Sequence, residues 1–292
     1  FQEKNKQLWM TSDAYPEPMP IQWMFGSGQH AMTPVSLLSN PEGSTELVEG
    51  SVSWFPPDEL GPTPGANLTG ATGIRSIGDH IDHDTTMECF GCHVTQLPHD
   101  DGRILQEALI KGVSCDRCHP GGDAHIAAVD RGDEHSMENW SDLSPLKSIN
   151  RCGECHRRAD QLTKAELSPE RLVLIRFAPV GIAMSECFLK QDSIQSDEHP
   201  FRMDCLTCHD PHQPAEKSAE YYLAKCLQCH GAQENQASEC TSATTSTECL
   251  DCHMPTVNVT ENLRLTDHWI RVRKSSDPPT AKSPNPEHAV TP

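Results

Sequence analysis

The sequence has few of the residues that normally build a protein core. Hydrophobic residues make up 36% of its 292 residues and aromatic residues 5%, with only seven Phe, five Trp and three Tyr. Both fractions are low for a domain of this length. The 23 Pro and 18 Gly also interrupt long regular elements. A chain of this composition needs apolar surface from another source, or it stays loose.

Long apolar runs and an excess of basic residues are also missing. No stretch approaches the roughly 20 apolar residues that span a bilayer. The 42 acidic residues outnumber the 23 basic ones, which gives a formal net charge of -19. This balance disfavours nucleic acid and anionic membranes as partners, and it favours basic proteins. The sequence shows no signal peptide and starts at Phe1, so we expect a processed, exported form.

What the sequence has in excess is cysteine, with 14 in all. Twelve of them belong to six copies of the pattern Cys-x-x-Cys-His. The paired cysteines are Cys89 and Cys92, Cys115 and Cys118, Cys152 and Cys155, Cys205 and Cys208, Cys226 and Cys229, and Cys249 and Cys252. The histidines that follow them are His93, His119, His156, His209, His230 and His253.

This repeated pattern is the attachment signature of c-type heme. Two thiols three positions apart add to the two vinyl groups of one porphyrin, and the following His is placed under the iron. Zinc ribbons or disulfides would use the cysteines but leave six histidines without a role. The sequence therefore predicts six covalently attached heme c groups, whose porphyrins supply the missing core. Because attachment machinery of this kind works outside the bacterial cytoplasm, we expect a periplasmic or extracellular protein.

Ten further histidines could bind the irons from the opposite side. They are His30, His80, His83, His99, His125, His135, His199, His212, His268 and His288. A second imidazole saturates the iron and lowers its reduction potential relative to a Met ligand. The candidate distal ligands are His30, His80, His83, His125, His212 and His268, with one of His80 and His83 expected to bind. His212 lies only three residues after His209, so we expect it to serve a neighbouring heme.

Two cysteines, Cys187 and Cys240, lie outside the six motifs. In an oxidising compartment they could form a disulfide. The alternative is two separate buried thiols, and the residues alone leave both open.

Five segments of the chain follow patterns found in a known group of cytochromes. The segments are 26–31, 51–55, 112–125, 176–188 and 249–271. They resemble the multiheme cytochromes of planctomycetes and acidobacteria, which are often fused to tetratricopeptide repeats. More distantly, the chain is similar to the tetraheme cytochrome and hydroxylamine-oxidoreductase superfamily. The resemblance covers roughly Gly26 to Val272, and no tetratricopeptide repeats follow it here.

This resemblance implies distal roles for particular residues. It assigns them to His30, His125, His212 and His268, whereas His80 and His83 have no clear counterpart. It also implies that Cys187 and Cys240 correspond to a pair of cysteines that recurs in such proteins.

The expected fold is mostly α with much irregular structure and little β, a multiheme cytochrome c fold organised around stacked hemes. Residues 1–75 would wrap the hemes, residues 76–276 would form a hexaheme body, and residues 277–292 would be a Pro-rich tail. We expect electron transfer between other redox proteins or copies of the chain itself, in a complex or filament. The alternative is a reductase or oxidase that acts on a small nitrogen or sulfur compound at one five-coordinate heme. Enzymatic activity is thus the less favoured interpretation.

Overall fold

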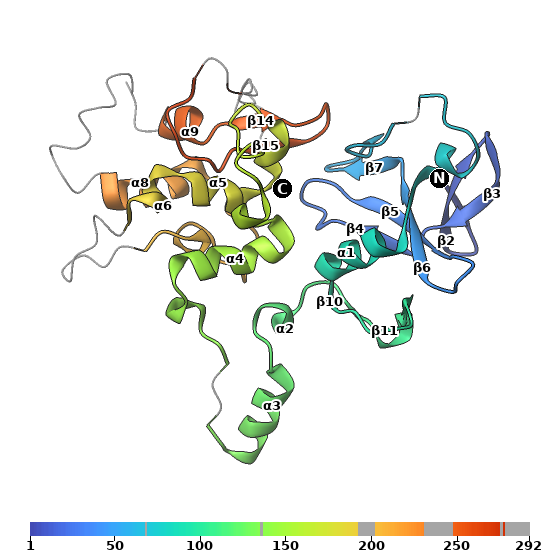
Figure 1. Ribbon diagram of the computed structural model, residues 1–292, viewed down its shortest axis with the longest axis horizontal. Coiled ribbons are helices and arrows are strands. Elements are labelled where there is room, and N and C mark those ends of the chain that lie inside the picture. The colour runs from blue at the N-terminus through green and yellow to red at the C-terminus, as the bar shows by residue number, and fades with distance from the viewer. Residues whose placement is uncertain (68, 135–136, 192–201, 231–247, 275–276, 278–292) are drawn as a thin grey trace. The chain divides into compact units, whose positions relative to one another are not determined.

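The computed structural model describes residues 1–67, 69–134, 137–191, 202–230, 248–274 and 277. The chain forms two compact units, Phe1–Glu138 and Asn139–Pro292, each described here by itself (Figure 1). No helix in the described part is long and apolar enough to cross a membrane.

The first unit is built mainly from antiparallel strands (Figure 1). A three-stranded sheet has the order β1-β2-β3, with bounds Gln2–Lys4, Gln7–Ser12 and Tyr15–Pro20. A four-stranded sheet has the order β4-β5-β6-β9, with bounds Trp23–Phe25, Thr33–Ser39, Thr45–Gly50 and Gly78–Ile81. The hairpins are β7-β8 (Val52–Phe55, Glu59–Pro62), β10-β13 (Val94–Gln96, Ile110–Lys111) and β11-β12 (His99–Asp100, Arg103–Ile104).

Short helices follow the large sheet of this unit. They are α1 (His83–His93), α2 (Cys115–Cys118) and α3 (Gly122–Arg131), with 3-10 turns η1 (Gly73–Ser76) and η2 (Gln106–Ala108). The carboxylate of Asp82 accepts a hydrogen bond from the Thr85 N–H at 2.9 Å, which caps the start of α1. The sheet strand β9 ends just before this cap, so the sheet fixes where α1 begins.

The core of the first unit consists of side chains from the sheet and from α1. Val35 and Leu47, on adjacent strands β5 and β6, are almost fully buried together with Phe90 of α1. The Phe90 ring lies edge-on to the rings of Trp23 and Phe25, with centroids 5.2 Å apart in each pair. Since Phe90 stands between Cys89 and Cys92, this packing anchors the first motif to the sheet.

The second unit is mainly helical. Its helices are α4 (Pro145–His156), α5 (Ala178–Met184), α6 (Glu186–Leu189), α8 (Ala219–His230) and α9 (Glu248–His253). The 3-10 turns are η3 (Trp140–Asp142), η4 (Ala159–Gln161), η5 (Leu172–Arg176) and η6 (Cys205–Thr207), and one hairpin joins β14 (Thr256–Asn258) to β15 (Arg264–Thr266). Buried Ile149, Ile182 and Met203 form its apolar cluster.

The prediction of a mostly helical chain with little β structure is wrong. Helices make up 35% and strands 25% of the structure, which has several small antiparallel sheets. Proline was a misleading signal, because Pro16 and Pro18 lie on β3, an edge strand where a missing N–H costs few ladder hydrogen bonds. Short alternating runs such as Thr45–Gly50 were the signal that would have corrected it. The division into residues 1–75, 76–276 and 277–292 stays a prediction.

The sheet core predicts unequal effects of two leucine substitutions. Leu47, 1% exposed, should cost about 2–5 kcal/mol of unfolding free energy when changed to Ala, because a cavity forms. Leu60, 61% exposed on β8, is the matched control and should change stability by about 0.5 kcal/mol or less. Guanidinium denaturation followed by tryptophan fluorescence measures both. Equal losses would show that the sheet core is not the stabilising element.

Candidate functional site

Four of the six Cys-x-x-Cys-His motifs lie at the C-terminal ends of α-helices, namely α1, α4, α8 and α9. The cysteines of the second motif begin and end the single turn α2, and the fourth motif begins on the 3-10 turn η6. Helical spacing puts the two cysteines on one face and the His, four positions after the first Cys, beside them. The backbone N–H groups of His119 and His209 donate to Cys115 O at 2.7 Å and Cys205 O at 2.9 Å, which closes the same turn in both. In these two motifs the backbone therefore brings the His beside the first Cys without any cofactor.

Burial favours the neutral form of several motif histidines. It lowers the pKa of His93, His156 and His209, because removal from water disfavours the charged imidazolium. A neutral imidazole is the form that binds a metal. The environment of these rings thus suits iron ligation.

Two other motif histidines are held through the nitrogen that would face away from an iron. His119 Nδ1 lies 3.1 Å from Glu138 O, and His253 Nδ1 lies 3.1 Å from Arg271 O. Metal-bound histidines usually donate their second ring N–H to a carbonyl or carboxylate, which fixes the tautomer and the ring orientation. Both rings therefore have Nε2 as the nitrogen to offer to iron.

Three of the predicted distal ligands show the same arrangement. His83 Nδ1 lies 3.0 Å from Thr45 O, and His268 Nδ1 lies 3.0 Å from Thr266 O. His212 Nδ1 lies 3.2 Å from the Asp210 carboxylate. The structure thus holds these rings as it holds the motif histidines.

The structure separates His80 from His83. His80 Nε2 lies 2.6 Å from Glu46 Oε2, so its outer nitrogen is engaged by a carboxylate. Of the two, His83 is the better placed ligand. His30 is exposed in the loop after β4 and His125 is half-buried on α3, and their ligand roles remain predictions.

His209 and His268 come together from distant parts of the second unit. Their ring centroids lie 6.2 Å apart. With a metal–nitrogen distance of about 2.0 Å and about 1.1 Å from nitrogen to ring centre, two imidazoles on opposite sides of one iron would have centroids about 6.2 Å apart. The spacing therefore matches two axial ligands of a single iron. Burial lowers the pKa of His268, which keeps this ring neutral as well.

Two residues of the second unit that sequence reasoning missed hold His268 in place. A Cβ at Gly181 would lie 2.7 Å from the His268 carbonyl carbon, so only glycine allows this approach of α5. Buried Ser185 accepts a hydrogen bond from the Ile270 N–H at 2.8 Å and donates to Gly181 O at 2.9 Å. The sequence feature that could have indicated this contact is the pair of small residues Gly181 and Ser185, which are four positions apart.

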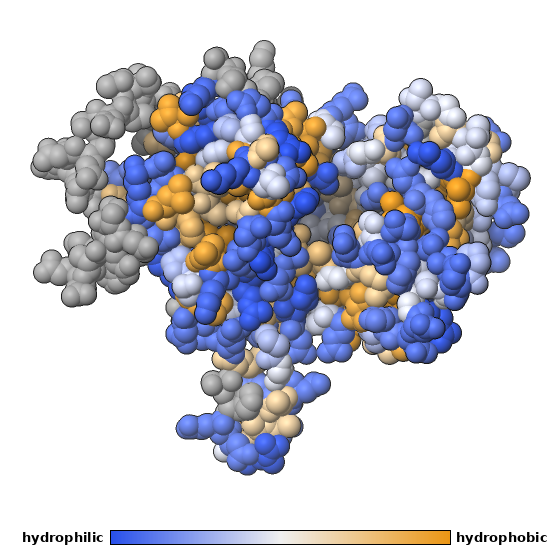
Figure 2. Space-filling model, viewed as in Figure 1, coloured by the Kyte–Doolittle hydropathy of each residue, from blue (hydrophilic) through white to orange (hydrophobic). Residues whose placement is uncertain are grey.

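Apolar side chains next to the motifs are exposed. Val113 is 63% exposed two residues before Cys115, and Leu227 is 46% exposed inside the fifth motif. Ile126 is 59% exposed next to His125. Figure 2 shows apolar side chains interrupting an otherwise hydrophilic surface. A porphyrin face beside each motif would cover such side chains, so the residues present fit heme.

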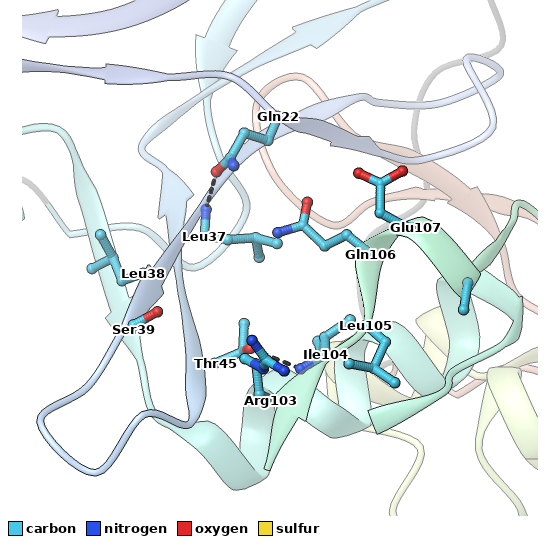
Figure 3. Close-up of a pocket in the computed structure, with 11 residues that line it drawn as sticks. Gln22, Leu37, Leu38, Ser39, Thr45, Arg103, Ile104, Leu105, Gln106 and Glu107 are labelled. Carbon is cyan, nitrogen blue, oxygen red and sulfur yellow. Dashed lines mark hydrogen bonds between the residues drawn. The ribbon is translucent and has the colours of Figure 1, made fainter. Parts of the chain in front are cut away.

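A separate pocket lies in the first unit. It has a volume of about 510 Å³ and is lined by Leu37, Thr45, Arg103, Gln106 and their neighbours. Figure 3 shows Arg103 and Thr45 on one side of it and Gln106 on the other. Its lining includes no cysteine or histidine, so the pocket is not part of the candidate heme sites.

One of the two cysteines outside the motifs lies in the described part of the chain. Cys187 is a half-buried thiol whose pKa is raised by burial. Cys240 lies outside the described residues, and so the Cys187–Cys240 disulfide stays a prediction. Among the described residues, no three or more His, Cys, Asp or Glu side chains are grouped to hold a metal ion by themselves.

The comparisons with known proteins bear on the first two motifs. A family model described as cytochrome c554 and c-prime matches residues 69–120. This match supports a c-type cytochrome with heme c. It spans less than half of the chain, and it contains the helix α1, the turn α2 and both His80 and His83. No curated protein and no solved structure matches the chain.

The close approach of Gly181 on α5 to the His268 backbone predicts that a larger residue at position 181 would disturb His268. Gly181→Ala should displace the His268 backbone and raise the high-spin fraction of the ferric holoprotein, because one iron loses an axial ligand. Ala183→Gly on the same helix is the control, since it removes atoms and lowers helix propensity by about 1 kcal/mol without a clash. Room-temperature ferric absorption and magnetic circular dichroism measure the effect. An unchanged low-spin spectrum in Gly181→Ala would show that His268 is not a ligand.

Proposed function

We propose that the chain is a hexaheme c-type cytochrome that conducts electrons between redox partners outside the cytoplasm. The proposal rests on one observation. Histidines of the motifs and histidines outside the motifs are held in the same way, with Nδ1 against a backbone carbonyl oxygen. His119 and His253 have it among the motifs, and His83 and His268 have it among the spare residues. Rings held in this way offer Nε2 to iron from either side.

Six saturated irons in this chain would favour electron transfer over substrate binding. An iron with two imidazole ligands has no open position for a substrate, whereas its oxidation state still changes. The spacing of the His209 and His268 rings supports such saturation at the fourth motif. The bound hemes would supply one-electron chemistry, and the protein's histidines would set their coordination.

The proposed compartment and partners follow from heme attachment and from charge. Heme c attachment favours a periplasmic or extracellular location. The net charge of -19 favours docking to basic redox proteins, because long-range attraction raises their association rate. Copies of the chain itself, in an oligomer or filament, are the other proposed partners.

Heme counting and spin state test this proposal directly. The purified holoprotein should contain six hemes per chain, measured by pyridine hemochrome absorbance and by intact mass. The ferric protein should be entirely low-spin at room temperature. A count below six would contradict the hexaheme assignment, and a high-spin fraction near one heme in six would favour the reductase or oxidase alternative.

Substitution of His83 and of His80 by Met tests which of the two histidines binds iron. His83→Met should raise one of the six midpoint potentials, because Met ligation favours the ferrous state. His80→Met should leave all six unchanged, since its outer nitrogen contacts Glu46. Spectroelectrochemical titration of both holoproteins makes the comparison. If His80→Met raises a midpoint potential and His83→Met does not, His80 leaves Glu46 and binds iron when heme is attached.

A further inference from the structure

The third and fourth motifs are tied together near the start of α4. Arg202, three residues before Cys205, donates through Nη2 to Trp140 O at 3.1 Å and through Nη1 to Leu143 O. Its Nε also donates to the Asp204 carboxylate at 2.7 Å. The Asp204 side chain is only 1% exposed and that of Arg202 is 30% exposed, so the carboxylate end of this ion pair is held away from water. Arg202 therefore fixes the segment before the fourth motif against the segment that leads into α4.

The same two motifs meet again near the end of α4. The side chains of Cys152 and Cys205, the first cysteines of the two motifs, lie close enough to each other to interact. Cys205 also packs on a buried cluster that contains Ile149, one helical turn before Cys152. Two independent contacts thus bring the attachment points of two different hemes together.

The iron ligands of these motifs are neighbours as well. His268 lies 6.2 Å from His209 between ring centroids. Burial, and to a smaller degree the nearby His156, the expected ligand of the third motif, lower the pKa of His268. The attachment cysteines and the ligands of the two motifs therefore share one region of the second unit.

We propose that the hemes of the third and fourth motifs form a contact pair through which electrons pass directly, an inference that rests on the proposed function. Each first cysteine bonds an edge carbon of its own porphyrin. With these two sulfurs adjacent, the edge carbons that they would bond on the two porphyrins would lie within roughly 8 Å of each other. In each transfer a ferrous iron of one heme is oxidised as the ferric iron of the other is reduced, and no atom moves.

Selective removal of hemes tests the pairing. Magnetic coupling between paired ferric low-spin hemes broadens their electron paramagnetic resonance signals, so removing one partner should reveal an isolated signal from the other. Cys205→Ala with Cys208→Ala removes the fourth heme, and Cys152→Ala with Cys155→Ala removes the third. Each variant should gain one new isolated low-spin signal. The variant lacking both hemes should gain none.

The quadruple variant makes the result specific to this pair. If the third and fourth hemes have other partners, removing both leaves new isolated signals, and the proposal is overturned. The first heme, removed by Cys89→Ala with Cys92→Ala, is the matched control, and its loss should leave the coupled signal of the pair intact.

A second variant keeps all six hemes, in case the deletions prevent maturation. His268→Met raises the potential of the fourth heme. On partial reduction this heme becomes ferrous and diamagnetic first, and an isolated signal of the third heme should then appear. Its absence overturns the pairing even when six low-spin hemes are present, whereas a count below six would overturn the proposed function instead.

Discussion

An imidazole can give only one ring nitrogen to an iron, so the protein must hold the other. This constraint connects the candidate ligands to the rest of the fold. The carbonyl groups that do the holding come from unlike places: Thr45 on a sheet strand, Glu138 after α3, and Arg271 in a C-terminal loop. A sheet strand and loops alike serve here as sources of correctly placed carbonyl oxygens.

The β structure of the first unit also serves to hold the second ring nitrogen of a candidate ligand. Strand β6 begins at Thr45, whose carbonyl faces His83 while its hydroxyl accepts from the Ile104 N–H at 2.9 Å. The buried Val35 and Leu47 on β5 and β6 keep this strand rigid. A loose arm around the hemes could not keep an imidazole within hydrogen-bond distance, because each freely rotating residue would add conformational entropy.

The sequence makes the attachment chemistry visible but hides the support for it. Cys89 to His93 are five consecutive residues, so their spacing alone predicts both a helical turn and a heme. The partner of His83 lies 38 residues earlier in the chain, and no local pattern marks Thr45 as its acceptor. Gly181 and Ser185 are 83 or more residues from the His268 segment that they hold. Local spacing was therefore readable, whereas pairings set by tertiary packing, including the sheets, were not.

One short segment of the second unit holds two candidate ligands at once. Arg271 accepts from His253 through its carbonyl, and its guanidinium bonds the Asp267 carboxylate at 3.0 Å, next to His268. Arg273 bonds the same carboxylate at 2.8 Å. Breaking one partner of such a buried ion network leaves a charge without compensation, so the segment resists local rearrangement. The candidate ligands His253 and His268 are consequently positioned by the same few residues, and a shift of Asp267 would disturb both.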